Sequence, residues 1–196
     1  SSDQCPCRAG VQATSGKPCS GRFVAFVRRR ITRVHFATLC LGGTLVLVTE
    51  EIRRNGVALA EFIRDQAIEK LFLPVTALVQ LAEAAQDGPL PTHLREVITT
   101  GELLQITPAI AHLFRHTGAR LHNHYGATEF QDATTLTLQG DPAEWPTLVP
   151  VGRPLHNVQV YILDEQNEPA AVGEAGEFCI GGVGVARGYL KRPELN

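Results

Sequence analysis

"VALAEFIRDQAIEKLFLPVTALVQLAEAAQ" (Val57–Gln86) contains a helical pattern, a short strand-like run and a second helical pattern in succession. Apolar residues recur at helical spacing over Val57–Lys70, which predicts a helix. The short apolar run LFLP then predicts a strand, and VTALVQLAEAAQ (Val75–Gln86) predicts a second helix. Strands that alternate with helices are typical of a parallel sheet covered by helices. The stretch therefore predicts an α/β fold.

The alternation continues on both sides of this stretch. GTLVLV (Gly43–Val48) predicts a buried strand, and LREVITTG (Leu94–Gly101) predicts a strand that ends on a Thr-Thr-Gly turn. Thr107 fits the N-cap of a further helix, Pro108 fits its first position, and Gly118 closes it. These elements extend the predicted parallel sheet.

The ends of the predicted strands indicate where a ligand would bind. ARLHNHYG (Ala119–Gly126) predicts the next strand and its exit loop. In open parallel sheets, ligands lie beyond the carboxyl ends of the strands. That rule makes TTGE (Thr99–Glu102) and NHYGATE (Asn123–Glu129) the candidate site.

The last third of the chain has a different pattern. VQVYILDEQNEPAAVGEAGEFCIGG (Val158–Gly182) alternates short β-like runs with turn signals. It predicts an antiparallel, β-rich layer packed beside the α/β sheet. We expect an α/β part over residues 36–140 and a β-rich part over residues 141–196.

Composition excludes several classes of protein. The formal net charge of −2 gives no general attraction to nucleic acid or to anionic membranes. No run approaches the roughly 18 apolar residues that a membrane span needs, and no secretory start is visible. The five cysteines are few and odd in number, which favours free thiols in a reducing cytoplasm.

Residues 1–35 break the regular pattern. They hold seven Lys and Arg residues but one acid, Asp3, and show no clear period. A basic arm that binds polyanions is one interpretation of FVRRRITRV, and a solvated, disordered tail is another. A third interpretation depends on the family resemblance given below.

Four histidines admit a metal or nuclease interpretation. His112 and His116 stand four apart on a predicted helix, a spacing that suits zinc, and His122 and His124 share one face of a predicted strand. No carboxylate lies between them as in a zinc protease motif, and no cysteine is near. Surface and loop histidines are the simpler interpretation.

Nucleotide binding explains more of Asn123–Glu129 at once. A Tyr at a strand end stacks on a purine base, and Gly126 lets the backbone approach a ligand. Thr128 offers a hydroxyl to a phosphate, and Glu129 suits a magnesium ion that bridges phosphates.

Four ordered motifs resemble the adenylate-forming superfamily, in particular the adenylation domains of nonribosomal peptide synthetases. NHYGATE resembles the family motif Asn-x-Tyr-Gly-x-Thr-Glu. GEFCIGGVGVARGYLKRPEL (Gly176–Leu195) resembles Gly-Glu-Leu-x-Ile-x-Gly-x-Gly-x-Ala-x-Gly-Tyr-Leu, which as an isolated motif could be only a tight hairpin and a bulge. VITTGELLQIT resembles the Thr-x-Gly-Glu-x-Leu segment, and LCLGGTLVLV fits the strand after the Phe-Asp motif. The resemblance covers roughly residues 36–196.

The resemblance implies an enzyme that activates an amino acid with ATP and Mg²⁺. The carboxylate attacks the α-phosphate to give an aminoacyl-adenylate and pyrophosphate, and the acyl group passes to the phosphopantetheine thiol of a carrier domain. Peptidyl carrier and condensation domains of a larger synthetase are the implied partners. The implied nucleotide site comprises Gly101 and Glu102 beside the adenine, Asn123 at its edge, Tyr125 stacked on it, Gly126 in the loop, Thr128 at the phosphates, and Glu129 as magnesium ligand.

The resemblance also implies an amino-acid pocket. Six residues fall at the family's specificity-conferring positions: Phe72, Ile98, Thr100, His124, Asp132 and Ala133. His124 and Asp132 make this pocket polar, which favours a polar or basic substrate side chain. The alternative is a nucleotide- or partner-binding module that kept the fold and lost the chemistry.

The chain departs from the family pattern in several places. The phosphate-binding loop survives at most as TSGKP (Thr14–Pro18), and the Phe-Asp motif is absent from the frame as written. The ribose-binding Asp and the catalytic Lys of the family lie outside the 196 residues. We expect these residues alone not to catalyse amino-acid-dependent pyrophosphate exchange, because catalysis here is mostly positioning and charge neutralisation.

The missing Phe-Asp motif suggests the third interpretation of residues 1–35. One choice of synonymous codons for residues 22–34, read one base later, gives G-S-S-P-S-S-V-D-A-S-Q-E-F. The family usually reads close to S-P-L-S-F-D-A-S-x-Q-E-I-F here. Our hypothesis is that residues 1–35 are an aberrant segment translated out of frame, which predicts poor order there.

Overall fold

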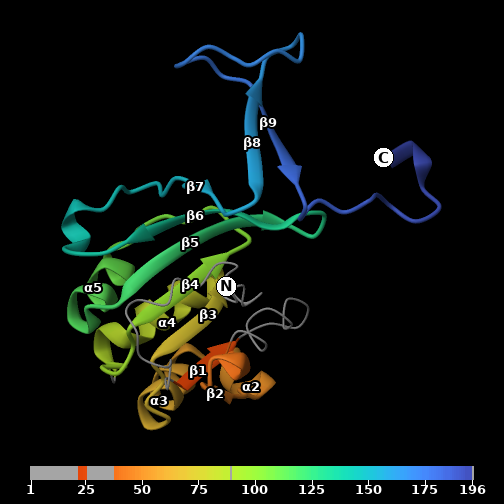
Figure 1. The fold of residues 1–196 in the computed structure, drawn as a ribbon. Helices are drawn as coiled ribbons and strands as arrows, with labels where there is room; N and C mark the ends of the chain where they lie inside the picture. Colours follow the sequence, from red (N-terminus) through yellow and green to blue (C-terminus); the bar gives the residue numbers. More distant parts are fainter. Residues whose placement is uncertain (1–21, 26–37, 89, 196) are drawn as a thin grey trace, which may run out of the picture.

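The computed structural model describes residues 22–25, 38–88 and 90–195, which form one large sheet and one separate hairpin (Figure 1). The large sheet has the strand order β2-β1-β3-β4-β5-β6-β7. Its first five strands are parallel, and β6 and β7 are added antiparallel. The strands are β1 (Arg22–Ala25), β2 (Thr44–Val46), β3 (Lys70–Pro74), β4 (Glu96–Thr100), β5 (Arg120–Ala127), β6 (Gln131–Leu138), β7 (Arg153–Pro154), β8 (Val158–Leu163) and β9 (Glu177–Gly182). The α-helices with described bounds are α2 (Glu50–Arg53), α3 (Gly56–Asp65), α4 (Val75–Asp87) and α5 (Pro108–Thr117), and short 3₁₀ turns lie at Pro142–Glu144 and Pro193–Leu195.

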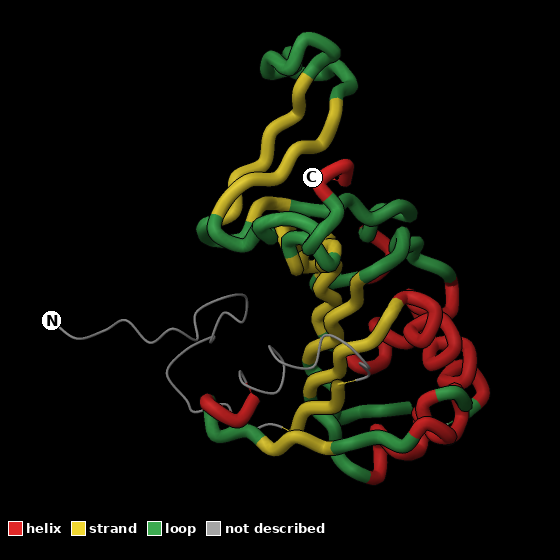
Figure 2. Tube along the Cα trace, turned by 90° about the vertical axis from the view of Figure 1, so that its right-hand side faces the viewer, coloured by secondary structure: helices red, strands yellow, loops and turns green. Residues whose placement is uncertain are grey.

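The hydrophobic core lies between one face of this sheet and the helices α3, α4 and α5, which gather on one side of the strands (Figure 2). Alternate residues of the central strands enter the core because side chains alternate across a strand. The fully buried residues on this side include Leu71, Leu73, Val97, Leu121, Leu78, Leu81, Ile110 and Leu113. None of the helices in the described part of the chain is long and apolar enough to cross a membrane.

The structure confirms the predicted α/β fold and two of the predicted helices, α4 and α5. α4 begins at Val75, as predicted, and ends at Asp87, one residue later than predicted. α5 begins at Pro108, and the Thr107 side chain caps it by accepting a hydrogen bond from the backbone N–H of Ile110 (3.2 Å). Gly118 ends α5 with a φ of 64°, a left-handed conformation that favours glycine.

The predicted helix over Val57–Lys70 is wrong at its C-terminal end. α3 stops at Asp65, because Ala67 adopts a left-handed φ of 49° and turns the chain. The backbone N–H of Ile68 then bonds to the carbonyl of Ile63 (3.0 Å), which is the six-residue closure of a Schellman motif. Both Ile side chains are completely buried, so burial of this turn outweighs the cost of a left-handed alanine.

Two predictions near the start of the sheet also need correction. The predicted buried strand Gly43–Val48 forms strand β2 over Thr44–Val46 only, and Leu47 is 74% exposed, because β2 lies at the edge of the described sheet and pairs with β1 alone. Within the segment 1–35, expected to be irregular, Arg22–Ala25 forms β1 and pairs in parallel with both β2 and β3. That expectation is wrong for these four residues, where backbone pairing on both edges imposes a strand. The other residues of 1–35 lie outside the described residues.

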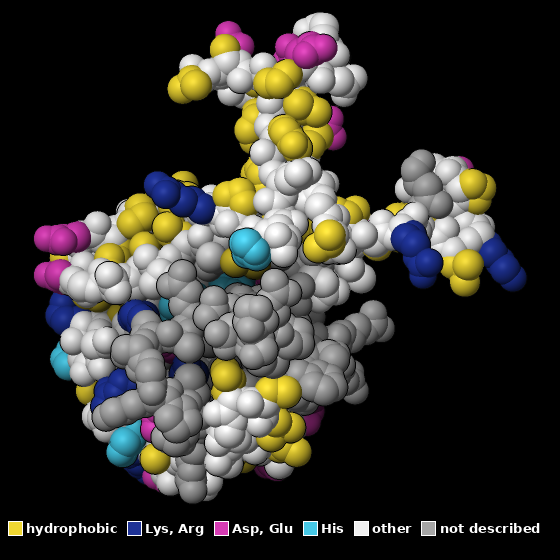
Figure 3. All heavy atoms as spheres, in the orientation of Figure 1, with side chains coloured by type: hydrophobic (Ala, Val, Ile, Leu, Met, Phe, Trp, Pro, Cys, Tyr) yellow, Lys and Arg dark blue, Asp and Glu magenta, His cyan; other side chains and the backbone are white. Residues whose placement is uncertain are grey.

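The β8–β9 hairpin projects away from the large sheet (Figure 1). The predicted antiparallel pairing is confirmed, and Phe178 of β9 contacts Tyr125 of β5. β8 and β9 pair only with each other within the described chain, and no described residue after Val149 is buried. Figure 3 shows hydrophobic side chains exposed along this hairpin. β7 belongs to the large sheet, and the division at residue 140 stays a prediction.

Candidate functional site

The two predicted site segments meet at the carboxyl ends of the parallel strands β4 and β5. The parallel register of β4 and β5 places Thr99 opposite Asn123 and Thr100 opposite His124. Gly101 and Glu102 follow directly after β4 and are both exposed, and Gly101 has a left-handed φ of 95°. The segments TTGE and NHYGATE therefore lie side by side, as expected for the carboxyl ends of parallel strands.

The predicted exit loop after β5 is instead a β-hairpin. β5 continues to Ala127 and pairs antiparallel with β6, so Tyr125 and Gly126 lie within the strand, at an irregularity in its register. A Cβ on Gly126 would lie 1.9 Å from the carbonyl oxygen of Gln131, and Gln131 has a left-handed φ of 60°. The tight closure of this hairpin therefore requires glycine at position 126. Only residues 128–130 form the turn.

Tyr125 is an exposed aromatic side chain held by two others. The residue is 39% exposed, and its ring lies edge-on to the ring of Phe178 at 5.6 Å between centroids. The ring of Phe130 lies 6.1 Å away at a tilt of 40°. Such edge contacts fix the orientation of a ring and leave part of its surface for a ligand. The arrangement suits stacking on a base.

Asn123 lies on the opposite face of β5 from the flanking histidines. It is buried, and its side-chain Nδ2 donates to the carbonyl oxygen of Pro150 (3.0 Å). This contact ties β5 to the chain that enters β7. The resemblance implied a contact between Asn123 and an adenine edge, and that role stays a prediction.

Thr128 and Glu129 lie at the turn of the β5–β6 hairpin. The phenolic O–H of Tyr189 donates a hydrogen bond to Glu129 Oε1, and this bond holds the pKa of the Glu129 carboxyl below its ordinary value. Glu129 is therefore ionised at neutral pH. The backbone N–H of Ala186 donates to the carbonyl oxygen of Glu129 (2.7 Å).

Five of the six predicted pocket residues share the sheet face that turns away from α3, α4 and α5. Phe72 pairs with Ile98, Thr100 pairs with His124, and Asp132 pairs with Gly126, so these side chains form adjoining rows. Phe72, Ile98 and Thr100 are buried, and the hydroxyl oxygen of Thr100 has no hydrogen-bond partner among the described residues. His124 Nδ1 lies 3.4 Å from Asp132 Oδ2. Ala133, the sixth, is fully buried beside Asp132 on β6.

Sequence reasoning missed an ion cluster at the opposite ends of these strands. The register aligns Lys70, Glu96 and Arg120 on β3, β4 and β5. Lys70 Nζ lies 3.0 Å from Glu96 Oε2, and Arg120 bonds to the other oxygen of Glu96. Burial alone would raise the pKa of Glu96, but the hydrogen bond and charge of Lys70 and the charge of Arg120 outweigh it and lower that pKa. The signal for this cluster in the sequence was a charged residue at the first position of each of β3, β4 and β5.

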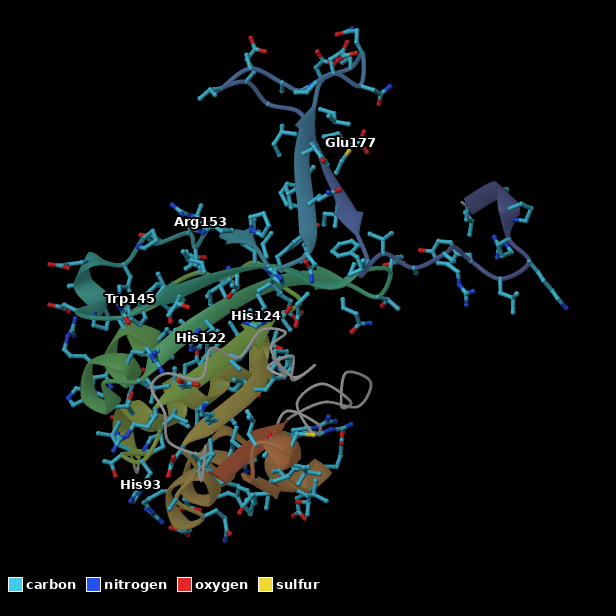
Figure 4. The ribbon with its side chains drawn as sticks, in the orientation of Figure 1. His93, His122, His124, Trp145, Arg153 and Glu177 are labelled. Carbon is cyan, nitrogen blue, oxygen red and sulfur yellow. The ribbon has the colours of Figure 1, made fainter. Side chains whose placement is uncertain are left out.

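His122 lies between this cluster and the predicted pocket and projects from β5 near His124 (Figure 4). Its Nδ1 lies 2.9 Å from Thr137 Oγ1, and its buried Nε2 has no hydrogen-bond partner in the part of the chain that the structure describes. Burial lowers the pKa of His122 to about 4, although Glu96 opposes the shift, so the ring is neutral at pH 7.

The four histidines do not converge on one point. His112 and His116 stack on each other along α5, with ring centroids 4.1 Å apart, whereas His122 and His124 lie on the sheet face away from the helices. In residues 22–25, 38–88 and 90–195, no group of three or more His, Cys, Asp or Glu side chains could hold a metal ion. The zinc and nuclease interpretations therefore gain no support from the described residues.

Comparisons with known proteins point to one family. A family model described as "AMP-binding enzyme" matches residues 30–190. Tyrocidine synthase 2 of Brevibacillus parabrevis is 40% identical over 162 residues, and gramicidin S synthase 2 of Brevibacillus brevis is 35% identical over 161 residues. Each alignment covers 82% of this chain but 4% of the relative, so the chain spans a small part of these proteins.

Solved structures share the fold. The crystal structure of a variant of the nonribosomal peptide synthetase FmoA3 has a TM-score of 0.77 and 24% identity to this chain. The match covers 91% of this chain and 20% of the FmoA3 chain. The crystal structure of holo-AB3403, a four-domain nonribosomal peptide synthetase bound to AMP and glycine, has a TM-score of 0.71 and 26% identity over 89% of this chain and 13% of its own.

Proposed function

Because this chain belongs to the AMP-binding enzyme family, we propose that it forms part of an amino-acid-activating adenylation domain in a nonribosomal peptide synthetase. The reaction joins an amino-acid carboxylate to the α-phosphate of ATP, which releases pyrophosphate, and the acyl group then passes to a phosphopantetheine thiol on a carrier domain. Two peptide synthases among the relatives and a structural neighbour bound to AMP and glycine support this proposal. Carrier and condensation domains are the proposed partners.

The juxtaposition of the β4 end with the β5–β6 hairpin is the observation that carries the proposal. Gly101 and Glu102 would border the adenine, and the exposed ring of Tyr125 would stack on it. Gly126 would let the hairpin backbone approach the nucleotide, and Thr128 would face the phosphates. All of these groups lie at the carboxyl edge of the parallel strands, where this sheet type binds ligands.

Glu129 fits the role of a magnesium ligand. Its carboxylate is ionised and lies on the turn next to Thr128. Magnesium is usually bound by one or two carboxylates together with substrate phosphates, so a single protein carboxylate is a normal donor set. When bound, the ion would neutralise phosphate charge while the hairpin orients the nucleotide.

The amino-acid side chain would lie on the sheet face opposite the helices. Phe72 and Ile98 supply an apolar surface there, and the hydroxyl of Thr100, which has no partner among the described residues, can hydrogen-bond to a substrate. His124 and Asp132 add a polar pair, and Ala133 leaves space beside it. This lining favours a polar or basic amino acid, because a buried polar group without a partner costs free energy.

A nucleotide-affinity measurement on paired variants tests the proposal. Tyr125→Ala removes the stacking ring and should weaken ATP binding by about 1–3 kcal/mol, or about one to two decades in affinity. Tyr125→Phe keeps the ring and should bind nearly as the wild type does. Glu129→Gln should weaken binding of the magnesium complex more than that of metal-free ATP.

Thermal melts of the same variants separate ligand effects from folding effects. If Tyr125→Ala and Glu129→Gln bind magnesium–ATP normally, or if they simply unfold the chain, the hairpin is not the nucleotide site. The alternative function is a nucleotide- or partner-binding module without chemistry. Amino-acid-dependent pyrophosphate exchange by the synthetase that contains these residues would favour the enzyme over that module.

A further inference from the structure

Residues 183–190, which we call the bracing segment, form hydrogen bonds to the turn that carries Glu129. This segment follows β9 and leaves it beside the tip of the β5–β6 hairpin (Figure 1). Ala186 donates its backbone N–H to the carbonyl oxygen of Glu129 (2.7 Å), and Tyr189 donates its phenolic O–H to Glu129 Oε1, 60 residues away in sequence. One donor holds the backbone and the other holds the carboxylate. Together they fix both the position and the direction of Glu129.

The hairpin has other contacts that set its shape without Tyr189. Gly126 packs against the backbone of Gln131, and the ring of Tyr125 packs edge-on against Phe178 of β9. The backbone N–H of Phe130 bonds to the carbonyl of Ala127 (3.4 Å). These backbone and ring contacts do not involve the hydroxyl of Tyr189. Within the hairpin this hydroxyl donates to the carboxylate of Glu129, so we expect its effect to fall on that carboxylate.

We propose that Tyr189 is a positioning residue for Glu129: it holds one carboxylate oxygen and leaves the other to a magnesium ion that arrives with a nucleoside triphosphate. This inference rests on the proposed function, in which Glu129 binds magnesium. A ligating carboxylate usually has a hydrogen-bonded partner behind it, and loss of that partner commonly weakens metal binding by 10–100-fold. The glycine-rich segment would then serve the nucleotide site through Tyr189 as well as shaping a turn.

The opposite possibility is that Tyr189 competes with the metal for the carboxylate of Glu129. It predicts a change in magnesium affinity of the opposite sign when the hydroxyl is removed. If the phenol blocked the oxygen that the metal needs, its removal would tighten magnesium binding. If the phenol orients the carboxylate, its removal weakens magnesium binding, because a rotating carboxylate must be ordered when the ion binds. A single variant therefore separates the two.

The test measures the affinity of the 196-residue chain for ATP by NMR titration, with saturating magnesium and without metal. Tyr189→Phe removes only the hydroxyl, and we expect about tenfold weaker binding of magnesium–ATP, at the lower end of that range because the charge of Glu129 remains, with unchanged binding of metal-free ATP. Tyr161→Phe is the matched control, because Tyr161 is an exposed tyrosine of β8. In a Glu129→Gln background, Tyr189→Phe should have no further effect. Tyr189→His keeps a ring N–H donor and should recover part of the affinity.

Each other outcome has a distinct meaning. Equal or tighter binding of magnesium–ATP by Tyr189→Phe overturns the positioning role and leaves the nucleotide site intact. Equal weakening with and without metal shows that the hydroxyl supports the turn itself, which also overturns the role. If the wild-type chain binds ATP no more tightly with magnesium than without it, the proposed magnesium site fails, and the role of Tyr189 fails with it. A thermal melt of each variant confirms that the compared chains are folded.

Discussion

Strand β4 and the β8–β9 hairpin are both built from β-branched and apolar residues, yet they differ completely in burial. All five residues of β4 are buried, whereas β8 and β9 contain no buried residue. β4 has a paired strand on each edge, and α4 and α5 cover one of its faces. Within the described chain, β8 has only β9.

The difference shows that composition alone does not decide which strand becomes core. A two-stranded hairpin removes little apolar surface from water and is marginally stable by itself, whereas a central strand shares its burial with neighbours on both edges. We therefore expect the large sheet to carry most of the free energy of unfolding. The hairpin should open locally at much lower cost.

Two leucine-to-alanine substitutions, one in the large sheet and one in the hairpin, should show the largest difference in the free energy of unfolding. Leu121 of β5 is completely buried, and Leu121→Ala should lower the free energy of unfolding by about 2–5 kcal/mol. Leu163 of β8 is only partly buried, and Leu163→Ala should cost less than about 1 kcal/mol. Urea unfolding of both variants measures the difference, and similar losses would show that the hairpin is part of the same core.

Acid should weaken the large sheet through His122. Its folded-state pKa of about 4 lies below its ordinary value of 6.5, so between these values the unfolded chain binds a proton that the folded chain does not. The free energy of unfolding should therefore fall as pH drops from about 6.5 to about 4, by up to about 3 kcal/mol. The lowered pKa of Glu96 acts at lower pH, because that stability is lost only as its carboxyl becomes protonated.

Urea unfolding across this pH range provides the measurement, and His122→Gln is the control. This variant should flatten the pH dependence between pH 6.5 and 4. An unchanged slope in His122→Gln would contradict the assignment to this ring.

The smallest effects are expected at two side chains that accept backbone hydrogen bonds, one at a helix start and one in a turn. Thr107 caps α5 in the core layer, and Thr107→Ala should cost about 1 kcal/mol in global unfolding. Asp164 Oδ1 accepts from the backbone N–H groups of Gln166 and Glu168 (both 2.9 Å) at the end of the hairpin. Asp164→Ala should speed hydrogen exchange at those amides and change global stability by less than about 0.5 kcal/mol. A global loss as large as that of Thr107→Ala would show that the hairpin unfolds together with the sheet.

The elements that sequence predicted well are those with local signals. α5 has Thr107 and Pro108 at its start and Gly118 at its end, and each acts within one turn of the helix. The end of α3 was missed because no glycine marks it. Ala67 takes the left-handed conformation only because Ile63 and Ile68 are buried together beneath it.

The candidate site likewise has features that local motifs predicted and features that only the tertiary structure shows. The order of motifs located Gly101, Tyr125 and Glu129 at strand ends, and the register then brought them to one edge of the sheet. The prediction of a loop after Gly126 overlooked a signal in the partner strand β6, where Thr and Leu alternate over Thr135–Leu138. The Glu96 cluster was missed because its three charges are distant in the chain and meet only in the parallel register.

Short patterns of residues were enough to predict the α/β class, the start and end of α5 and the family of the chain. Tertiary structure alone decided that His122 is neutral, that Asn123 is bonded to Pro150, and that Tyr189 holds Glu129. These properties depend on burial and on hydrogen bonds between groups far apart in the chain. Such contacts form only after the sheet has brought distant strands together, so no local pattern of residues records them.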